Sequence, residues 1–330
     1  MNENEFFEKI GSLLDKRLCI YGFKIIYEDK KPRIIGFIDT KDSMKLLTEK
    51  FKDTNFDLTI LEETVPPQIR YGIVKIPVTD MRRDPRFRSE RIHQLIFGEI
   101  VKILRFENEY ILVKDVRTDY TGYIKSSHID LISHDQIEKM KNEFEEGIVS
   151  ERFAPVKFGD NEFFVPFGSK IPGRKTGNRW KGMIGDRRIE CQLADVKIQR
   201  SFKDIEEKWN LFLGTPYLWG GTSSYGYDCS GYVGRLYDYA CIKIPRDADL
   251  QQKFSTEIEE KDLKFGDLIF FPGHVGMYVE DGKMVHANLT QGGVGISRII
   301  NPSNDYEEDL RKSILKFGRV HSINIKEFDF

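Results

Sequence analysis

The stretch that decides the fold of the C-terminal part spans residues 217–240 and reads YLWGGTSSYGYDCSGYVGRLYDYA. Two glycines, Gly220 and Gly221, precede the dipeptide Asp228-Cys229, and large apolar residues follow it at helical spacing. These residues are Tyr232, Val233, Leu236, Tyr237 and Ala240. The pattern predicts a helix that begins at Cys229, with Asp228 as its N-cap.

A cysteine at the start of a helix is a candidate nucleophile. Unbonded backbone N–H groups and the positive end of the helix dipole favour the thiolate, which is the reactive form. The negative charge of Asp228 opposes thiolate formation, so we expect Asp228 to cap the helix or to hold a cationic group of a substrate. Burial as a small residue is the commoner fate of a cysteine, and the helix alone does not decide between the two interpretations.

Two histidines follow in a predicted β-hairpin whose strands cover residues 274–279 and 283–287. A two-residue Asp-Gly loop would pair His286 with Met277 and place the two imidazoles on opposite faces. A three-residue loop, with Gly282 in the left-handed conformation, pairs His286 with Gly276 and brings His274 and His286 to one face. A shared role for the histidines therefore requires the three-residue loop.

Cys229, His274 and His286 together suit thiol catalysis. In this interpretation Cys229 attacks, His274 takes and returns the proton, and His286 fixes the tautomer and orientation of His274. Either histidine alone would more often be structural. The combination of all three favours the catalytic interpretation.

The rest of the chain predicts several modules, as expected for 330 residues. Residues 1–63 are typical of a small α/β unit, and Pro66-Pro67 marks a linker. Short alternating strands over 68–132, and a helix followed by strands over 133–200, predict two small β-barrels. Residues 201–330 would form the catalytic domain. In the first unit we expect a helix from residue 6 to 14, strands at 18–27 and 33–39, a helix at 41–51 and a strand at 57–61.

Six ordered motifs in the C-terminal part resemble the NlpC family of papain-like bacterial cell-wall peptidases. They are Tyr217-Leu218-Trp219-Gly220-Gly221, Asp228-Cys229-Ser230-Gly231, Pro245-Arg246-Asp247-Ala248, Gly266-Asp267-Leu268, His274-Val275-Gly276-Met277-Tyr278 and His286-Ala287. The resemblance covers about 120 residues. It implies an α+β fold, in which a papain-like cysteine peptidase domain follows two bacterial SH3-like barrels and the small N-terminal unit.

The SH3-like modules and Arg246-Asp247 resemble the subgroup of γ-D-glutamyl-L-diamino acid endopeptidases. This implies murein tripeptide or tetrapeptide substrates with a free N-terminal L-alanine, as in cell-wall peptide recycling. It also implies that Glu90 and Tyr120 of the first barrel meet the free amine beside Asp228. We expect these carboxylates to be poorly compensated until an ammonium group arrives.

Further candidates for substrate binding lie near the nucleophile. Ser230 follows it directly, and Arg91, Arg246 and Asp247 are alternatives or companions to the amine-binding residues. Tyr217 would hold the oxyanion or the substrate through its hydroxyl group, or would only pack. The backbone N–H of Cys229 is the preferred oxyanion donor.

Composition excludes other classes. The net charge is -2, with 51 basic and 53 acidic residues, so no single-signed field indicates nucleic acid. The four cysteines lack metal-ligand or disulfide spacing, and we expect no metal and no cofactor. An acidic N-terminus without a long apolar run predicts a cytoplasmic protein that does not bind membranes, unless export uses another route. The oligomeric state is not predictable.

Two other functions stay open at this point. One is a secreted or surface-acting peptidoglycan hydrolase whose SH3-like modules bind the wall. The other is an inactive protein that only binds wall peptides, although the complete set of Cys229, His274 and His286 argues against it.

Overall fold

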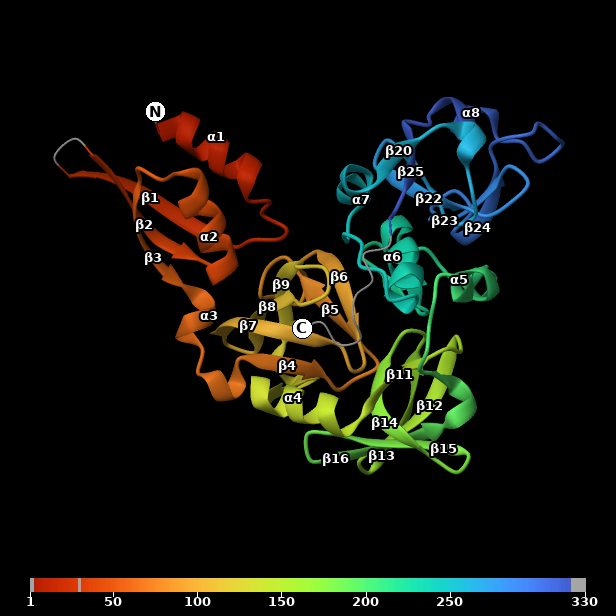
Figure 1. Cartoon of the computed structure of the whole chain (residues 1–330), viewed down its shortest axis with the longest axis horizontal. Coiled ribbons are helices and arrows are strands. Elements are labelled where there is room, and N and C mark those ends of the chain that lie inside the picture. The colour runs from red at the N-terminus through yellow and green to blue at the C-terminus, as the bar shows by residue number, and fades with distance from the viewer. Residues whose placement is uncertain (1–2, 29–30, 322–330) are drawn as a thin grey trace. The chain divides into compact units, whose positions relative to one another are not determined.

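The computed structural model of the chain describes residues 3–28 and 31–321. The chain forms two compact units (Figure 1). The N-terminal unit comprises Met1–Ile73, Met81–Glu90 and Ile100–Ile137, and the catalytic unit comprises Val74–Asp80, Arg91–Glu99 and Glu138–Phe330. The division into four domains stays a prediction.

The first elements of the N-terminal unit match those expected from the sequence. Helices α1 (Glu3–Leu13) and α2 (Lys41–Lys50) accompany a sheet of three strands, β1 (Tyr21–Glu28), β2 (Lys31–Ile38) and β3 (Asn55–Ile60). β2 is central, antiparallel to β1 and parallel to β3. The core combines both helices with the sheet through Phe6, Ile10, Leu14, Ile34, Ile38 and Leu47.

A second sheet of the N-terminal unit contains neighbouring strands in the order β10-β4-β7-β8-β9. Their bounds are β4 (Tyr71–Val74), β7 (Ile100–Glu107), β8 (Tyr110–Asp115), β9 (Thr121–Lys125) and β10 (Ile129–Ile132). Pro67 begins a short 3₁₀ turn, Pro67–Ile69, after helix α3 (Leu61–Thr64). The strand order is that of an antiparallel sheet, and its closure into an SH3-like barrel stays a prediction.

Buried ion pairs join the two sheets of the N-terminal unit. Lys114 Nζ of β8 lies 2.9 Å from Asp39 Oδ2, and Asp39 is fully buried. Lys102 Nζ of β7 lies 2.7 Å from Glu62 Oε2. Because a buried charge is costly without its partner, these pairs hold the small α/β element against the strands that follow it.

A sheet of seven strands opens the catalytic unit, in the order β13-β12-β16-β15-β14-β11-β17. It follows helix α4 (His134–Glu143), at the place where the sequence predicts a helix and a second barrel. The fully buried Trp180 anchors it, with Nε1 donating to Ile171 O at 2.8 Å. The strands are β11 (Glu145–Val149), β12 (Phe153–Phe158), β13 (Asn161–Pro166), β14 (Lys170–Thr176), β15 (Arg179–Ile184), β16 (Arg187–Gln192) and β17 (Val196–Lys197). Barrel closure stays a prediction here too.

The remainder of the catalytic unit packs helix α6 (Cys229–Tyr239) on an antiparallel sheet in the order β20-β25-β21-β22-β23-β24 (Figure 1). The strands are β20 (Thr256–Ile258), β21 (Leu268–Phe271), β22 (His274–Tyr278), β23 (Lys283–Asn288), β24 (Gly293–Arg298) and β25 (Lys316–Arg319). Helices α7 (Ala248–Phe254) and α8 (Glu308–Lys312) complete it. Their common core draws side chains from α6, β21, β22 and β23.

The region 201–330 opens with a short helix that ends in a tighter turn. Residues Lys203–Lys208 form α5, and Trp209–Phe212 form a 3₁₀ turn instead of continuing the α-helix. Leu213 is extended and Gly214 has a φ of 78°, a left-handed value that favours glycine. The tighter turn therefore leads directly into the break at Gly214.

A buried arginine ties α6 to the segment Arg91–Glu99. Arg235 NH1 lies 2.7 Å from Glu99 Oε1 and 3.1 Å from Asp238 Oδ2, and its Nε donates to Thr222 O at 2.9 Å. The side chains of Arg235 and Glu99 are 1% and 2% exposed. Loss of one partner would leave the other as an uncompensated buried charge.

Within residues 3–28 and 31–321, no helix has both the length and the apolar character that a membrane span requires.

We predict that Arg235→Met lowers the free energy of unfolding by about 3 kcal/mol, because Glu99 loses its buried partner. Urea denaturation followed by tryptophan fluorescence measures the change. Lys312→Met is the matched control, since the Lys312–Glu308 pair is two-thirds exposed and should cost less than about 1 kcal/mol. Equal losses in the two variants would contradict the assignment of Arg235 as a structural tie.

Candidate active site

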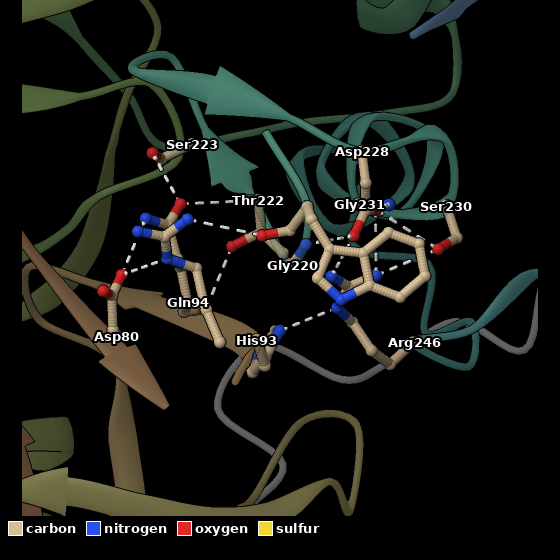
Figure 2. Close-up of polar contacts among 12 residues, drawn as sticks. Asp80, His93, Gln94, Gly220, Thr222, Ser223, Asp228, Ser230, Gly231 and Arg246 are labelled. Atoms are coloured by element: carbon tan, nitrogen blue, oxygen red, sulfur yellow. Dashed lines mark hydrogen bonds and ion pairs between the residues drawn. The ribbon is translucent and has the colours of Figure 1, made fainter. Parts of the chain in front are cut away.

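The carboxylate of Asp228 organises the N-terminus of α6 (Figure 2). Asp228 is extended, with φ -90° and ψ 176°, and its Oδ1 accepts a hydrogen bond of 2.7 Å from the Gly231 N–H. Its Oδ2 accepts one of 3.0 Å from the Gly220 N–H. The predicted N-cap is therefore confirmed, and the same carboxylate holds the Gly220-Gly221 turn against the helix that begins at Cys229.

Arg246 forms a bidentate ion pair with Asp228. Its NH1 lies 3.1 Å from Oδ1 and its NH2 lies 2.6 Å from Oδ2, and NH1 also donates to Ser230 Oγ at 2.9 Å. Asp228 and Arg246 are both buried. The expectation that Asp228 is poorly compensated without substrate is wrong, because a bidentate guanidinium already balances its charge.

Segment Arg91–Glu99, part of the catalytic unit, supports this network from the other side (Figure 2). Arg246 Nε donates to the Nδ1 of the fully buried His93 at 2.9 Å. Gln94 accepts from Thr222 N–H and from Ser223 Oγ, each at 3.2 Å, while its own Nε2 donates to Asp80. Neither His93 nor Gln94 was predicted, because neither belongs to a motif and their contacts with Arg246 and Thr222 span more than 120 positions.

The histidine hairpin has the register that the catalytic interpretation requires. Strands β22 and β23 pair Met277 with Val285, which places Gly276 opposite His286. The loop between Val279 and Lys283 has three residues, closed by a Val279 N–H to Lys283 O bond of 3.0 Å, and Gly282 has a φ of 72°. The predicted three-residue loop is confirmed.

The two imidazoles meet directly. His274 Nε2 lies 2.7 Å from His286 Nδ1. The other ring nitrogen of His286, Nε2, lies 2.8 Å from Asn288 Nδ2 and 2.9 Å from Ser297 Oγ. Neither Asn288 nor Ser297 was predicted. Asn288 lies on the same face of β23 two residues after His286, and Ser297 becomes a neighbour through the pairing of β23 with β24.

The thiol of Cys229 is protonated at neutral pH. Burial raises its pKa to about 11, and the charge of Asp228 adds to the increase. Hydrogen bonds from the backbone N–H groups of Val275 and Ser230, and the charge of Arg246, act in the opposite direction but are outweighed. In the protein without substrate, burial therefore outweighs the backbone hydrogen bonds that favour the thiolate.

Both histidines are neutral at pH 7 for the same reason. Burial lowers the pKa of His274 to about 4, partly offset by the charge of Asp228. Burial and the neighbouring His274 lower the pKa of His286 to about 3. The resting site thus holds a thiol and two neutral imidazoles rather than a thiolate–imidazolium pair.

The remaining candidates of the catalytic unit lie near the nucleophile or next to it in the chain. Burial and the charges of Cys229 and Asp228 raise the pKa of Tyr217 to about 12, so its hydroxyl group is a donor at neutral pH. Ser230 is buried and bonded to Arg246 and Asp228. Asp247 is the N-cap residue of α7.

Glu90 and Tyr120 belong to the N-terminal unit, where both interact electrostatically with Arg83. Glu90 Oε2 lies 2.9 Å from Arg83 Nε, and Tyr120 is 5% exposed. Glu90 and Tyr120 each contribute to raising the pKa of Arg83. The expectation that Glu90 is poorly compensated is therefore also wrong, and the convergence of Glu90 and Tyr120 with Asp228 stays a prediction.

No group of three or more His, Cys, Asp or Glu side chains in the described ranges, 3–28 and 31–321, is arranged to hold a metal ion. Each cysteine is a free thiol. The backbone N–H of Val275, next to His274, bonds the sulfur of Cys229, and a thiol with a pair of bonded histidines can carry out nucleophilic attack with general acid–base assistance.

Comparison with known proteins agrees with this chemistry. The model of the NlpC/P60 family matches residues 214–309. A γ-D-glutamyl-L-lysine dipeptidyl-peptidase of Bacillus subtilis is 30% identical over 240 residues, which are 66% of this chain and 78% of the relative. The chain belongs to the NlpC/P60 family.

Other relatives of the NlpC/P60 family match over similar lengths. Dipeptidyl-peptidase 6 of Lysinibacillus sphaericus is 28% identical over 276 residues, which are 76% of this chain and 99% of the relative. The crystal structure of an NlpC/P60 family protein from Bacillus cereus shares the fold with a TM-score of 0.66 at 18% identity, over 76% of this chain and 99% of that one. This NlpC/P60 protein is therefore a cysteine peptidase.

We predict that alkylation of Cys229 by iodoacetamide accelerates about tenfold for each pH unit between pH 7 and pH 9, because a thiol with a pKa of about 11 gains thiolate steadily over that range. Mass spectrometry of the peptide that contains Cys229 gives the rate, with Cys229→Ala as the control for the other thiols. A rate that is constant from pH 6 to pH 9 would show that the ion pair forms before substrate binds.

Proposed function

We propose that this protein is a γ-D-glutamyl-L-diamino acid endopeptidase that acts on murein tripeptides or tetrapeptides with a free N-terminal L-alanine. The observation that carries the proposal is the arrangement of Cys229 at the N-terminus of α6 with His274 and His286 bonded at 2.7 Å on β22 and β23. The relative from Bacillus subtilis is named a γ-D-glutamyl-L-lysine dipeptidyl-peptidase, which supports the choice of scissile bond.

The chemistry would proceed through a thioester. His274 takes the proton of Cys229, and the thiolate attacks the γ-carbonyl carbon of D-glutamate. His274 then returns the proton to the leaving amino group of the diamino acid, and water hydrolyses the thioester to regenerate the thiol. The N–H groups of Ser230 and Val275 that bond the sulfur would offset part of its buried charge during the first step.

Recognition of the free amine would fall mainly to Glu90. Asp228 accepts five hydrogen bonds, two of them from Arg246, and has little capacity left for an ammonium group. Glu90 pairs with Arg83, and its side chain is 42% exposed. An ammonium group would share Glu90 with Arg83, with Tyr120 as a further acceptor.

The proposal includes the place of action. Murein peptides that are still attached to glycan chains lack a free N-terminal alanine, so an enzyme that requires this amine would act on released peptides. We therefore propose a role in cytoplasmic recycling of cell-wall peptides rather than in trimming of the wall.

We predict that acetylation of the N-terminal alanine of the tripeptide lowers kcat/KM by at least a hundredfold, on the order of 3 kcal/mol, because charge-assisted hydrogen bonds are lost and bulk is added. Measurement covers free tripeptide, acetylated tripeptide and intact sacculi, with product detection by mass spectrometry. Equal cleavage of the first two would exclude an amine requirement, and release of peptides from sacculi would favour the wall hydrolase.

The same assay identifies the amine-binding carboxylate. Glu90→Gln should reduce the preference for the free tripeptide at least tenfold. Glu109→Gln is the matched control, because Glu109 also pairs with a cation, Lys125, and is 68% exposed. A preference unchanged by Glu90→Gln would remove Glu90 from recognition but would leave the peptidase assignment intact.

A further inference from the structure

The hydrogen bonds around His286 constrain where its proton resides. The ring is 3% exposed, Nδ1 faces His274 Nε2, and Nε2 faces both Asn288 Nδ2 and Ser297 Oγ. Ser297 can donate or accept, but an amide nitrogen only donates. The orientation of the Asn288 amide therefore decides the tautomer.

A backbone hydrogen bond fixes that orientation. The Gln291 N–H donates to Asn288 Oδ1 at 2.7 Å, and only an oxygen atom can accept it. The opposite arrangement, with Nδ2 toward Gln291, would place two donors against each other. Asn288 Nδ2 must consequently point at His286, where it donates across 2.8 Å.

The orientation of the Asn288 amide sets the tautomers of both His286 and His274. Because Nε2 of His286 accepts from Asn288, the neutral ring carries its proton on Nδ1 and donates it to His274 Nε2 at 2.7 Å. The neutral His274 then carries its own proton on Nδ1. In this tautomer neither nitrogen of His274 has a lone pair available for the thiol of Cys229, since Nε2 is occupied by His286.

We propose that Asn288 is a positioning residue that holds the histidine pair in a resting tautomer, and that catalysis requires the pair to switch to a tautomer supported by Ser297. This inference deepens the proposed function, because it concerns the base of the same reaction. In the competent tautomer His286 carries its proton on Nε2 and donates to Ser297 Oγ, and His286 Nδ1 accepts from His274 Nε2. His274 Nδ1 is then free to take the thiol proton.

The switch leaves the number of protons on the two rings unchanged. Water supplies a proton to His286 Nε2, His286 passes its Nδ1 proton to His274 Nε2, and His274 releases its Nδ1 proton to water, so each ring remains neutral. Asn288 must first leave His286, because two donors cannot face each other at 2.8 Å. The turn that follows Asn288 is bonded to the segment before the nucleophile, because the Tyr217 N–H donates to Gly292 O at 2.9 Å.

Long-range ¹H–¹⁵N NMR of the protein labelled with ¹⁵N-histidine tests the tautomer without substrate. The chain has six histidines, and His286→Gln identifies the signals of His286 by their loss. We expect a protonated Nδ1 and an unprotonated Nε2 at His286 in the unsubstituted protein and in Ser297→Ala. A protonated Nε2 in the unsubstituted protein would overturn the inference.

The Asn288→Asp variant provides a second test of the role of Asn288 in setting the tautomer. Aspartate still accepts from the Gln291 N–H, but its other oxygen accepts from His286, so Nε2 should become protonated and the competent tautomer should prevail. Alkylation of Cys229 by iodoacetamide at pH 7 should then accelerate at least fivefold. Asn301→Asp adds the same charge on an exposed turn of the same unit and should leave the rate unchanged.

The outcomes separate this inference from the proposed function. If Asn288→Asp is alkylated no faster than Asn301→Asp, or if its His286 keeps the Nδ1 proton, Asn288 does not set the tautomer. Neither measurement depends on the substrate, so failure of the murein-peptide assay would leave both results interpretable.

Discussion

The carboxylate of Asp228 is the point on which the site depends. It caps the helix that carries Cys229, holds the Gly220 turn and binds Arg246, which in turn contacts His93 of a distant segment. A buried carboxylate is stable only when all of these donors are in place. The backbone before the nucleophile, the first turn of α6 and the segment Arg91–Glu99 are therefore fixed together by one group.

The same group makes the thiol harder to ionise. Its charge and the burial of the sulfur raise the pKa of Cys229 to about 11, while burial leaves His274 neutral. A site built in this way keeps its nucleophile protonated until substrate alters the surroundings. The histidine tautomer set by Asn288 has the same effect, because it withholds the lone pair that the thiol proton needs. Both the Cys229 thiol and the histidine pair thus contribute to the low reactivity of the site without substrate.

Much of the fold and the catalytic set could be predicted from local sequence. The spacing of apolar residues after Cys229 gave the helix, and strand parity with Gly282 gave the loop that brings His274 and His286 together. Such features depend on residues close in the chain. The N-cap role of Asp228 was predictable for the same reason.

What sequence could not provide are the long-range contacts and the balance of opposing effects. His93 and Arg246 are in contact although they lie 153 positions apart in the chain. The orientation of the Asn288 amide is fixed by the backbone N–H of Gln291 in the next turn. The pKa of Cys229 depends on how completely the sulfur is buried, which no motif reports. The prediction that Asp228 and Glu90 are poorly compensated was wrong because their cationic partners, Arg246 and Arg83, lie in other segments of the chain.

The central claim is that Cys229 forms a thioester with the γ-carboxyl group of D-glutamate. Acid quenching of a reaction with free tripeptide, followed by peptide mapping in the mass spectrometer, tests it most directly. We expect an L-alanyl-γ-D-glutamyl adduct on the peptide that contains Cys229, and no adduct or product with Cys229→Ala. Product formation by Cys229→Ala, or an adduct on another residue, would contradict it.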